Sequence, residues 1–444
     1  MRILLSAYSC GPHVGSEPGV GWNWSVLLAQ RHDVVVLTSE EFRPFIETEL
    51  SLRPRPRLHF VILEIPLTRH ISYAAYPKYI LWQLAAFPLA LRLHRKWRFD
   101  VVQHLTMGTF RYPSWLGFLG IPFVFGPVGG GERAPIRLYQ GLPLRVRLRE
   151  RLRTAVMFSG FLDPFFRIAL SRADVYVAKT KQSMEVVPAS VRRKAVVHLE
   201  IGANPEEIIL KPRERVAGEP LRALMVCRLI GWKGIHFAID AARQFRSQGV
   251  KVEIEVCGAG SLLPWLQGEV QSHGLQEHFR FLGAVSRNEV REKYRQAHLL
   301  LFPSLHDSSG NAVIEALGYG LPVICLDLGG PAEIVTEGCG IVLPTCGRSR
   351  ADVGNALAQA VVTLETNESL RQRLALGAIA RAHELLWSNQ VSAVEALLEN
   401  VVKRRQTSSD EVTQCASTCR REVFKHIGGL KNLTTAFLPK VGRY

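Results

Sequence analysis

Residues 303–331 read PSLHDSSGNAVIEALGYGLPVICLDLGGP and hold the pattern that decides the fold. The apolar run at 299–302 just before them predicts a buried strand, and the run at 323–326 predicts another. Between the two runs, a polar loop and a Gly lead into a helical pattern at 311–317, which a Gly and a Pro end. A strand, a helix and a strand in this order predict a parallel β–α–β unit.

Two carboxylates, Asp307 and Glu315, bracket the loop and the first turns of this helix. The free N–H groups and positive dipole end of a helix N-terminus suit a phosphate, whereas carboxylates suit hydroxyl groups. The stretch therefore fits a sugar-phosphate ligand. It fits equally a plain β–α–β unit whose loop acids are solvated, and taken alone it leaves both interpretations open.

The composition is that of an ordinary globular protein, with 47% apolar and 21% charged residues. A length of 444 residues is enough for two or three domains. Lys and Arg total 55 against 39 acids, which gives a formal charge of +16. This balance favours anionic partners (nucleotides, nucleic acid or acidic membrane surfaces) without choosing among them.

The cysteines and the apolar runs favour a cytoplasmic protein with no metal site. None of the eight cysteines forms a Cys-x-x-Cys pair, and Cys415 and Cys419 stand four apart without companions at zinc-like spacing. We therefore expect reduced thiols. No signal peptide is visible, and the longest apolar stretch, 80–91, falls short of the roughly 20 residues that a spanning helix needs.

The first half predicts a doubly wound α/β domain. A Gly-rich loop at 8–21 precedes a helix at 22–30, and a long helical segment at 71–97 has expected breaks at Pro77 and Pro88. The glycines do not form the G-x-G-x-x-G pattern of dinucleotide-binding proteins. Strands are expected at 3–6, 34–37, 58–63, 100–104, 121–125 and 175–178.

A polar, Pro-rich stretch at 202–220 marks the expected domain boundary, and a second β/α series follows it. We expect a first domain at 1–203, a second at 204–386, a helix at 387–404 that packs back on the first domain, and a loosely ordered tail at 405–444. Expected strands of the second domain are 223–227, 252–256, 279–282, 299–302, 323–326 and 340–343, and expected later helices are 353–365, 369–386 and 390–402.

Residues 133–153 carry seven arginines against one acid, Glu150. They form either a solvated helix face or a patch for anionic lipid head groups or an anionic acceptor. The aromatic segment 71–97 in the same half indicates either a membrane-proximal acceptor or plain core packing. The sequence leaves these alternatives open.

Arg228 and Lys233 lie where a strand of the second half ends and a helix begins. Ligands of open α/β sheets bind at this carboxyl edge. Two cations there can hold a diphosphate and stabilise the charge that builds up as it departs. The alternative is two basic surface residues near a turn.

Residues 1 to about 404 resemble the family 4 (group 1) retaining glycosyltransferases of the GT-B architecture, in which two Rossmann-like domains face each other across a cleft. The resemblance rests on Arg228 with Lys233-Gly234, on Asp307 and Glu315, and on the Gly329-Gly330 loop with Glu333. It implies transfer of a sugar from a UDP- or GDP-type donor to a glycan or lipid-linked glycan, in polysaccharide or cell-envelope biosynthesis. It implies no cofactor and no metal, and no Asp-x-Asp occurs in the chain.

By this resemblance, Arg228 and Lys233 grip the donor diphosphate and Glu315 binds the ribose hydroxyls. Asp307 binds a hydroxyl of the transferred sugar, although it is one methylene shorter than the family's usual Glu. His104 contacts the donor sugar near the anomeric carbon and completes a catalytic set with Arg228, Lys233 and Asp307.

The same resemblance implies a loop that meets the phosphates from each domain. Gly15 belongs to the glycine loop of the first domain, and the residues at 129–132 shape the acceptor side. In the second domain, backbone amides cap the phosphates at Ser309, Gly310, Asn311 and Ala312.

Two further classes of function stay open at this point: a non-catalytic nucleotide- or nucleic-acid-binding protein that keeps the fold, and a nucleotide-sugar epimerase or hydrolase. The basic run lacks interleaved aromatic residues that could stack on bases, so we expect no nucleic acid partner. The expected partners are a nucleotide-sugar, a glycan or lipid-linked acceptor, and an anionic membrane at the inner face of the cell.

Overall fold

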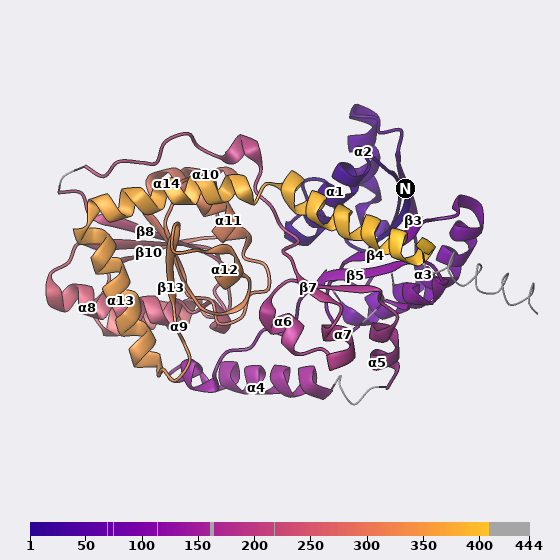
Figure 1. Ribbon diagram of the computed structural model, residues 1–444. Helices are drawn as coiled ribbons and strands as arrows, with labels where there is room; N and C mark the ends of the chain where they lie inside the picture. The colour runs from indigo at the N-terminus through magenta and orange to yellow at the C-terminus, as the bar shows by residue number, and fades with distance from the viewer. Residues whose placement is uncertain (69, 74, 113, 160–163, 217, 408–444) are drawn as a thin grey trace, which may run out of the picture.

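A computed structural model describes residues 1–407 except 69, 74, 113, 160–163 and 217. Of the expected loosely ordered tail at 405–444, residues 405–407 are instead the end of a helix, and 408–444 lie outside the described residues. The chain forms two α/β domains that lie side by side, each built on a parallel sheet with helices on both faces (Figure 1). The predicted fold class, two Rossmann-like domains in the GT-B arrangement, is confirmed.

The first sheet has seven parallel strands in the order β3-β2-β1-β4-β5-β6-β7. Helices cover both of its faces, so its central strands β1 and β4 are buried along nearly their whole length, including polar residues such as Gln103 and His104. The strands are β1 (Arg2–Ala7), β2 (Asp33–Ser39), β3 (Leu58–Leu63), β4 (Val101–Thr106), β5 (Phe123–Val128), β6 (Val175–Ala178) and β7 (Ala195–Val197).

The helices of this half differ from the predicted ones at the prolines and glycines. The predicted segment 71–97 is helical only from Tyr76, so Pro77 marks the start of α3 and not a break within it; in the first turn a missing N–H has no effect. The predicted break at Pro88 is wrong: the helix runs through it, and its buried face still packs on the sheet. The helices are α1 (Ser16–Leu28), α2 (Arg43–Leu52), α3 (Tyr76–Trp97), α4 (Leu144–Ser159), α5 (Pro164–Ser171), α6 (Lys181–Glu185) and α7 (Ala189–Arg192).

The second sheet has six parallel strands in the order β10-β9-β8-β11-β12-β13. All six lie within two residues of their predicted bounds, because short apolar runs between helical patterns leave little choice. The strands are β8 (Leu221–Val226), β9 (Val252–Cys257), β10 (Phe279–Gly283), β11 (Leu299–Phe302), β12 (Val323–Leu326) and β13 (Gly340–Leu343). The helices are α8 (Ile235–Gln248), α9 (Leu263–Ser272), α10 (Arg287–Gln296), α11 (Asn311–Gly318), α12 (Gly329–Ile334), α13 (Arg350–Thr366) and α14 (Glu368–Glu384).

A segment of the first half packs on the second domain. Leu138, Tyr139 and Leu142, in and after the short 3-10 helix η4 (Ile136–Tyr139), are buried in the core of the second domain. His236 of α8 donates to the carbonyl oxygen of Leu138 at 3.1 Å. The arginine-rich helix α4 follows directly and lies along the lower edge of both domains in Figure 1.

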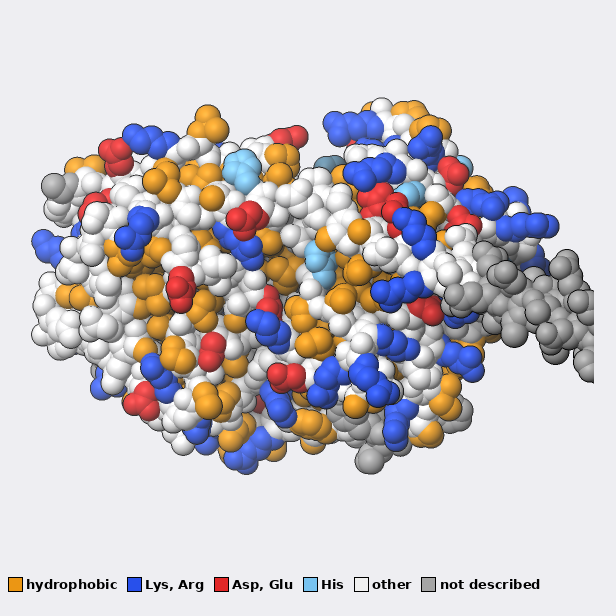
Figure 2. Space-filling view, viewed as in Figure 1, with side chains coloured by type: hydrophobic (Ala, Val, Ile, Leu, Met, Phe, Trp, Pro, Cys, Tyr) orange, Lys and Arg blue, Asp and Glu red, His pale blue; other side chains and the backbone are white. Residues whose placement is uncertain are grey.

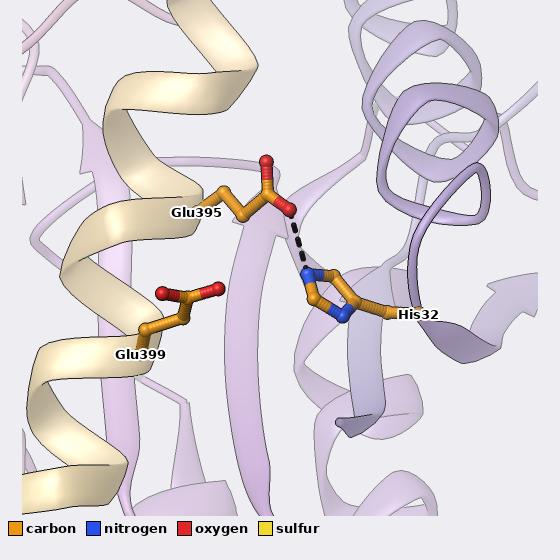
Figure 3. A group of neighbouring side chains, drawn as sticks. All are labelled: His32, Glu395 and Glu399. Carbon is orange, nitrogen blue, oxygen red and sulfur yellow. Dashed lines mark hydrogen bonds and ion pairs between the residues drawn. The ribbon is translucent and has the colours of Figure 1, made fainter.

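The last described helix, 387–407, crosses in the opposite direction and lies against the first domain (Figure 1). Its Glu395 accepts from His32 at 2.8 Å and pairs with Arg31 at 3.0 Å. Figure 3 shows His32 and Glu395 pointing at one another, with Glu399 on the next turn. The segment around η4 from the first half of the chain therefore packs on the second domain, and the last helix from the second half packs on the first domain.

None of the described helices combines the length and the apolar character that crossing a membrane requires.

Candidate active site

Both sheets reverse their strand order at the same part of the molecule. The order changes direction between β1 and β4 in the first sheet and between β8 and β11 in the second. Ligands of open α/β sheets bind outside the carboxyl ends of the strands at such a point. The loops that follow these four strands meet around a cavity of about 420 Å³ between the domains. Residues of the first domain line one wall of this cavity, and residues of the second domain line the other.

The second-domain wall carries the predicted phosphate-binding groups Arg228, Ser309 and Asn311, together with Ser308. Arg228 is exposed, and no described carboxylate forms an ion pair with it. Helix α11 begins beside it at Asn311. Gly310 precedes the helix with a φ of 93°, a left-handed conformation that a residue with a side chain would adopt at a cost. An unpaired cation and the N-terminus of a helix thus face the same space.

Lys233 and Asp307, both predicted to contact the donor, contact each other instead of the cavity. The ammonium of Lys233 and the carboxylate of Asp307 form a short ion pair, and both side chains are largely buried. Neither residue lines the cavity. The carbonyl oxygen of Asp307 accepts from the amide of Gly330 at 2.7 Å, so the Gly329-Gly330 loop supports this turn from behind.

Glu315 lies on the second turn of α11 and accepts from the hydroxyl of Tyr294 at 3.1 Å. The same hydroxyl lies 3.3 Å from the carbonyl oxygen of Ala312. Burial raises the pKa of the Glu315 carboxyl above its ordinary value, although the hydrogen bond from Tyr294 acts in the opposite direction. Glu315, Ala312 and Gly310 are neighbours of the cavity wall rather than part of it.

The first-domain loops approach the same region. Gly15 ends the loop after β1, immediately before α1, and is exposed without lining the cavity; Glu17 in the first turn of α1 does line it. Gly129 allows the two domains to touch, since a Cβ there would lie 2.7 Å from the Cβ of Ser308. Its neighbour Gly130 lines the cavity.

The structure places His104, predicted to contact the donor sugar, away from the cavity wall. His104 lies within β4, not at its end, and is fully buried. Its Nδ1 is 3.2 Å from the hydroxyl of Ser6, and its Nε2 is 3.2 Å from the hydroxyl of Tyr79. Burial lowers its pKa to about 3, so the ring is neutral. The cavity is lined instead by the five residues that follow it, 105–109.

Sequence reasoning missed a charged pair in the first-domain wall, Lys179 and Glu200. The ammonium of Lys179 lies 2.7 Å from Oε1 of Glu200, and both side chains are buried. Burial alone would lower the pKa of Lys179, but the carboxylates of Glu200, Glu17 and Glu132 raise it above its usual value. Lys179 directly follows β6, and Glu200 comes soon after β7. The sequence signal that could have identified Lys179 and Glu200 is their position just after the ends of strands.

One described group, His32 with Glu395 and Glu399, has ligand atoms within 4.8 Å of one another, as a metal site would require. Cations of the protein already surround it. The amino terminus lies 3.3 Å from Nδ1 of His32, and Arg31 pairs with Glu395. This group fastens the last helix to the first domain.

Comparison with known proteins finds a family whose members the second domain is similar to. Residues 207–381 match the family described as glycosyl transferases group 1. The matched range includes all six strands of the second sheet. Arg228, Lys233, Asp307 and Glu315 all lie inside the matched range.

The curated relatives match over part of their length. Similar proteins include the amylovoran biosynthesis glycosyltransferase AmsK of Erwinia amylovora, 29% identical over 45% of this chain and 48% of the relative. A second is the 2-deoxystreptamine N-acetyl-D-glucosaminyltransferase of Niallia circulans, 30% identical over 34% of this chain and 38% of the relative. The chain therefore spans about half or less of these relatives.

Solved structures resemble nearly the whole described chain. Sucrose-phosphate synthase from Thermosynechococcus elongatus superposes with a TM-score of 0.62 at 17% identity, over 91% of this chain and 99% of that one. HepE from Anabaena, solved with UDP, has a TM-score of 0.58 at 16% identity, over 90% of this chain and all of that one. At these identities the likeness shows the fold, which the group 1 match complements.

Proposed function

We propose that this protein is a retaining, metal-independent glycosyltransferase that holds a UDP- or GDP-sugar in the cavity between its domains. One observation carries the proposal: the carboxyl edges of both sheets meet at a cavity into which the unpaired cation Arg228 and the start of α11 face. An anionic donor with a sugar attached matches such a site, because the second-domain wall suits phosphate and the first-domain wall carries groups that bind hydroxyls. The comparisons do not favour a non-catalytic nucleotide- or nucleic-acid-binding protein.

The donor diphosphate lies against Arg228 and the amides of Ser309, Gly310, Asn311 and Ala312 in this proposal. Lys233 joins Arg228 by exchanging its partner Asp307 for the phosphate, which frees the Asp307 carboxylate for a sugar hydroxyl. Glu315 binds the ribose, and Gly15 brings the first-domain loop toward the phosphates. His104 has no direct part, since both of its ring nitrogens have protein partners.

Transfer breaks the bond between the anomeric carbon and the phosphate oxygen and forms one between that carbon and an acceptor oxygen on the same face. The departing diphosphate takes the proton of the acceptor hydroxyl. Arg228 and the start of α11 stabilise the charge that collects on the diphosphate, which is the largest contribution a rigid site can make. These groups supply the positive charge from the protein itself, and turnover should persist in a metal chelator.

The acceptor is a glycan or lipid-linked glycan of polysaccharide or cell-envelope biosynthesis in this proposal. Support comes from relatives named for such pathways, among them AmsK and the putative colanic acid biosynthesis glycosyltransferase WcaL of Escherichia coli, 31% identical over 125 residues.

A membrane at the inner face of the cell is proposed as the surface on which the protein works, with α4 in contact with it. Leu144, Leu148 and Leu152 repeat every four residues on α4 and are 70%, 62% and 63% exposed. Exposed arginines flank them, and Figure 2 shows Lys and Arg gathered along the lower edge, where Figure 1 draws α4. An apolar stripe bordered by arginines complements anionic lipid head groups.

The test of the activity uses a panel of UDP- and GDP-sugars. A true donor raises the melting temperature by mass action, and nucleic acid does not. Transfer releases nucleoside diphosphate only after a glycan acceptor is added, whereas a hydrolase releases it from donor alone. Failure of every UDP- and GDP-compound to stabilise the protein would contradict the proposal.

A further inference from the structure

The first-domain wall of the cavity contains a carboxylate that is only half satisfied. Oε1 of Glu200 receives the ammonium of Lys179 at 2.7 Å and the hydroxyl of Ser309. Oε2 of the same carboxylate is buried and has no hydrogen-bond partner in the described part of the chain. The Glu200 side chain is 4% exposed and lines the cavity.

A buried carboxylate oxygen without a donor is costly, on the order of 1–3 kcal/mol or more. Lys179 and Ser309 both approach Oε1, so neither contact removes this cost at Oε2. Native proteins leave few polar atoms in this state, and such an atom commonly meets a ligand or water. The terminal torsion of a Glu side chain is broad, so a modest rotation turns Oε2 toward the cavity.

The chemistry of the missing partner follows from the charge. A carboxylate accepts hydrogen bonds and repels phosphate, so its partner is a donor such as a hydroxyl group. Because Glu200 contacts Ser309, the hydroxyl group of the ligand that binds Oε2 must lie near Ser309. Ser309 belongs to the loop that, in the proposed function, caps the donor diphosphate, and the transferred sugar is bonded directly to that diphosphate.

We propose that Glu200 is a sugar-binding residue whose Oε2 accepts a hydrogen bond from a hydroxyl group of the transferred sugar. The proposal rests on the proposed function, because the sugar reaches Glu200 only when the diphosphate lies beside Ser309. Lys179 is a positioning residue that holds the carboxylate in place through Oε1. Specificity for the donor sugar therefore depends on both domains.

The test is a calorimetric titration of the full chain and of Glu200→Gln. The titrants are UDP-glucose, UDP-galactose, UDP-N-acetylglucosamine and GDP-mannose, each compared with its own nucleoside diphosphate. In Glu200→Gln the amide oxygen keeps Lys179 and Ser309, and the amide NH₂ replaces Oε2 with a donor. We expect the preferred nucleotide-sugar to bind about tenfold or more weakly, whereas UDP or GDP alone binds within about twofold of the wild-type affinity.

A second variant and a control separate sugar contact from folding. Lys179→Met with Glu200→Met replaces the buried pair by apolar residues and should fold, with the same selective loss. Glu395→Gln alters another buried ion pair outside the cavity and should change neither affinity. Equal weakening of sugar and diphosphate, or no weakening in Glu200→Gln, would overturn the role of Glu200. Absence of UDP and GDP binding in the wild type would overturn the proposed function itself.

Discussion

At the scale of single residues, Glu315, the proposed ribose-binding residue, lowers stability at neutral pH. Burial raises the pKa of its carboxyl, so the folded chain prefers the protonated form. The protonated Glu315 carboxyl contributes stability at pH values below its pKa in the unfolded chain. This contribution is lost as the pH rises through the higher pKa that the carboxyl has in the folded chain. At neutral pH the buried charge therefore destabilises the fold.

Glu315→Gln should consequently raise the melting temperature at pH 7.5, and the gain should shrink as the pH falls toward 4.5. The same variant should weaken nucleoside diphosphate binding by roughly tenfold if the carboxylate holds the ribose. Thermal unfolding at both pH values and a titration at pH 7.5 measure the two effects. A lower melting temperature at pH 7.5 would show that the bond from Tyr294 outweighs burial.

Several of the predicted site residues line the cavity, and one, His104, lies inside a strand instead. Arg228, Ser309 and Asn311 line the cavity because they follow strands at the edge where the sheet changes direction. His104 looked equivalent, but β4 continues for two residues beyond it and encloses its ring. One residue of register decides whether a side chain at a strand end faces a ligand or the core, and local sequence does not fix it.

At the scale of elements, apolar periodicity predicted the strands well and the helices less well. Residues 58–63, 175–178 and 299–302 form strands with the predicted bounds. By contrast, α1 begins at Ser16, inside the predicted Gly-rich loop, and β7 was not predicted. Packing decided the case of α1, because a helix that buries a face tolerates the glycine and proline which local propensity disfavours.

Helix α4 makes a prediction of its own about membrane binding. Replacing Leu144, Leu148 and Leu152 together by Ser should reduce binding to phosphatidylglycerol-containing vesicles by about tenfold or more. Their exposure means that folding should be unaffected. Vesicle cosedimentation of the full chain measures the effect, and binding should also fall as salt rises.

The matched control is Leu376→Ser, on α14 of the other domain, where the side chain is 56% exposed. It should leave vesicle binding unchanged. Equal binding by the triple Ser variant and the wild type would show that α4 does not contact lipid.

At the scale of the whole molecule, each domain depends on a segment from the other half of the chain. Helix 387–407 contributes a buried ion pair to the first domain through Glu395 and His32. Glu395→Ala should lower the free energy of unfolding by about 2 kcal/mol, since it removes the buried hydrogen bond from His32 and the ion pair with Arg31.

Chemical denaturation measures this loss, with Glu399→Ala as the control. Glu399 lies on the next turn of the same helix and is 43% exposed, 3.9 Å from Lys403, so its removal should change the free energy of unfolding by less than about 0.5 kcal/mol. Equal effects of the two variants would contradict a role for the His32 pair in holding the helix.

The central claim is that a nucleoside diphosphate binds between the two sheets at Arg228. Calorimetric titration of UDP and GDP into wild type, Arg228→Ala and Arg243→Ala tests it most directly, because Arg243 is an exposed arginine on α8 of the same domain. We predict that one of the two nucleotides binds the wild type and Arg243→Ala equally, and binds Arg228→Ala about tenfold or more weakly. Unchanged affinity in Arg228→Ala, or no binding of either nucleotide to the wild type, would contradict the account.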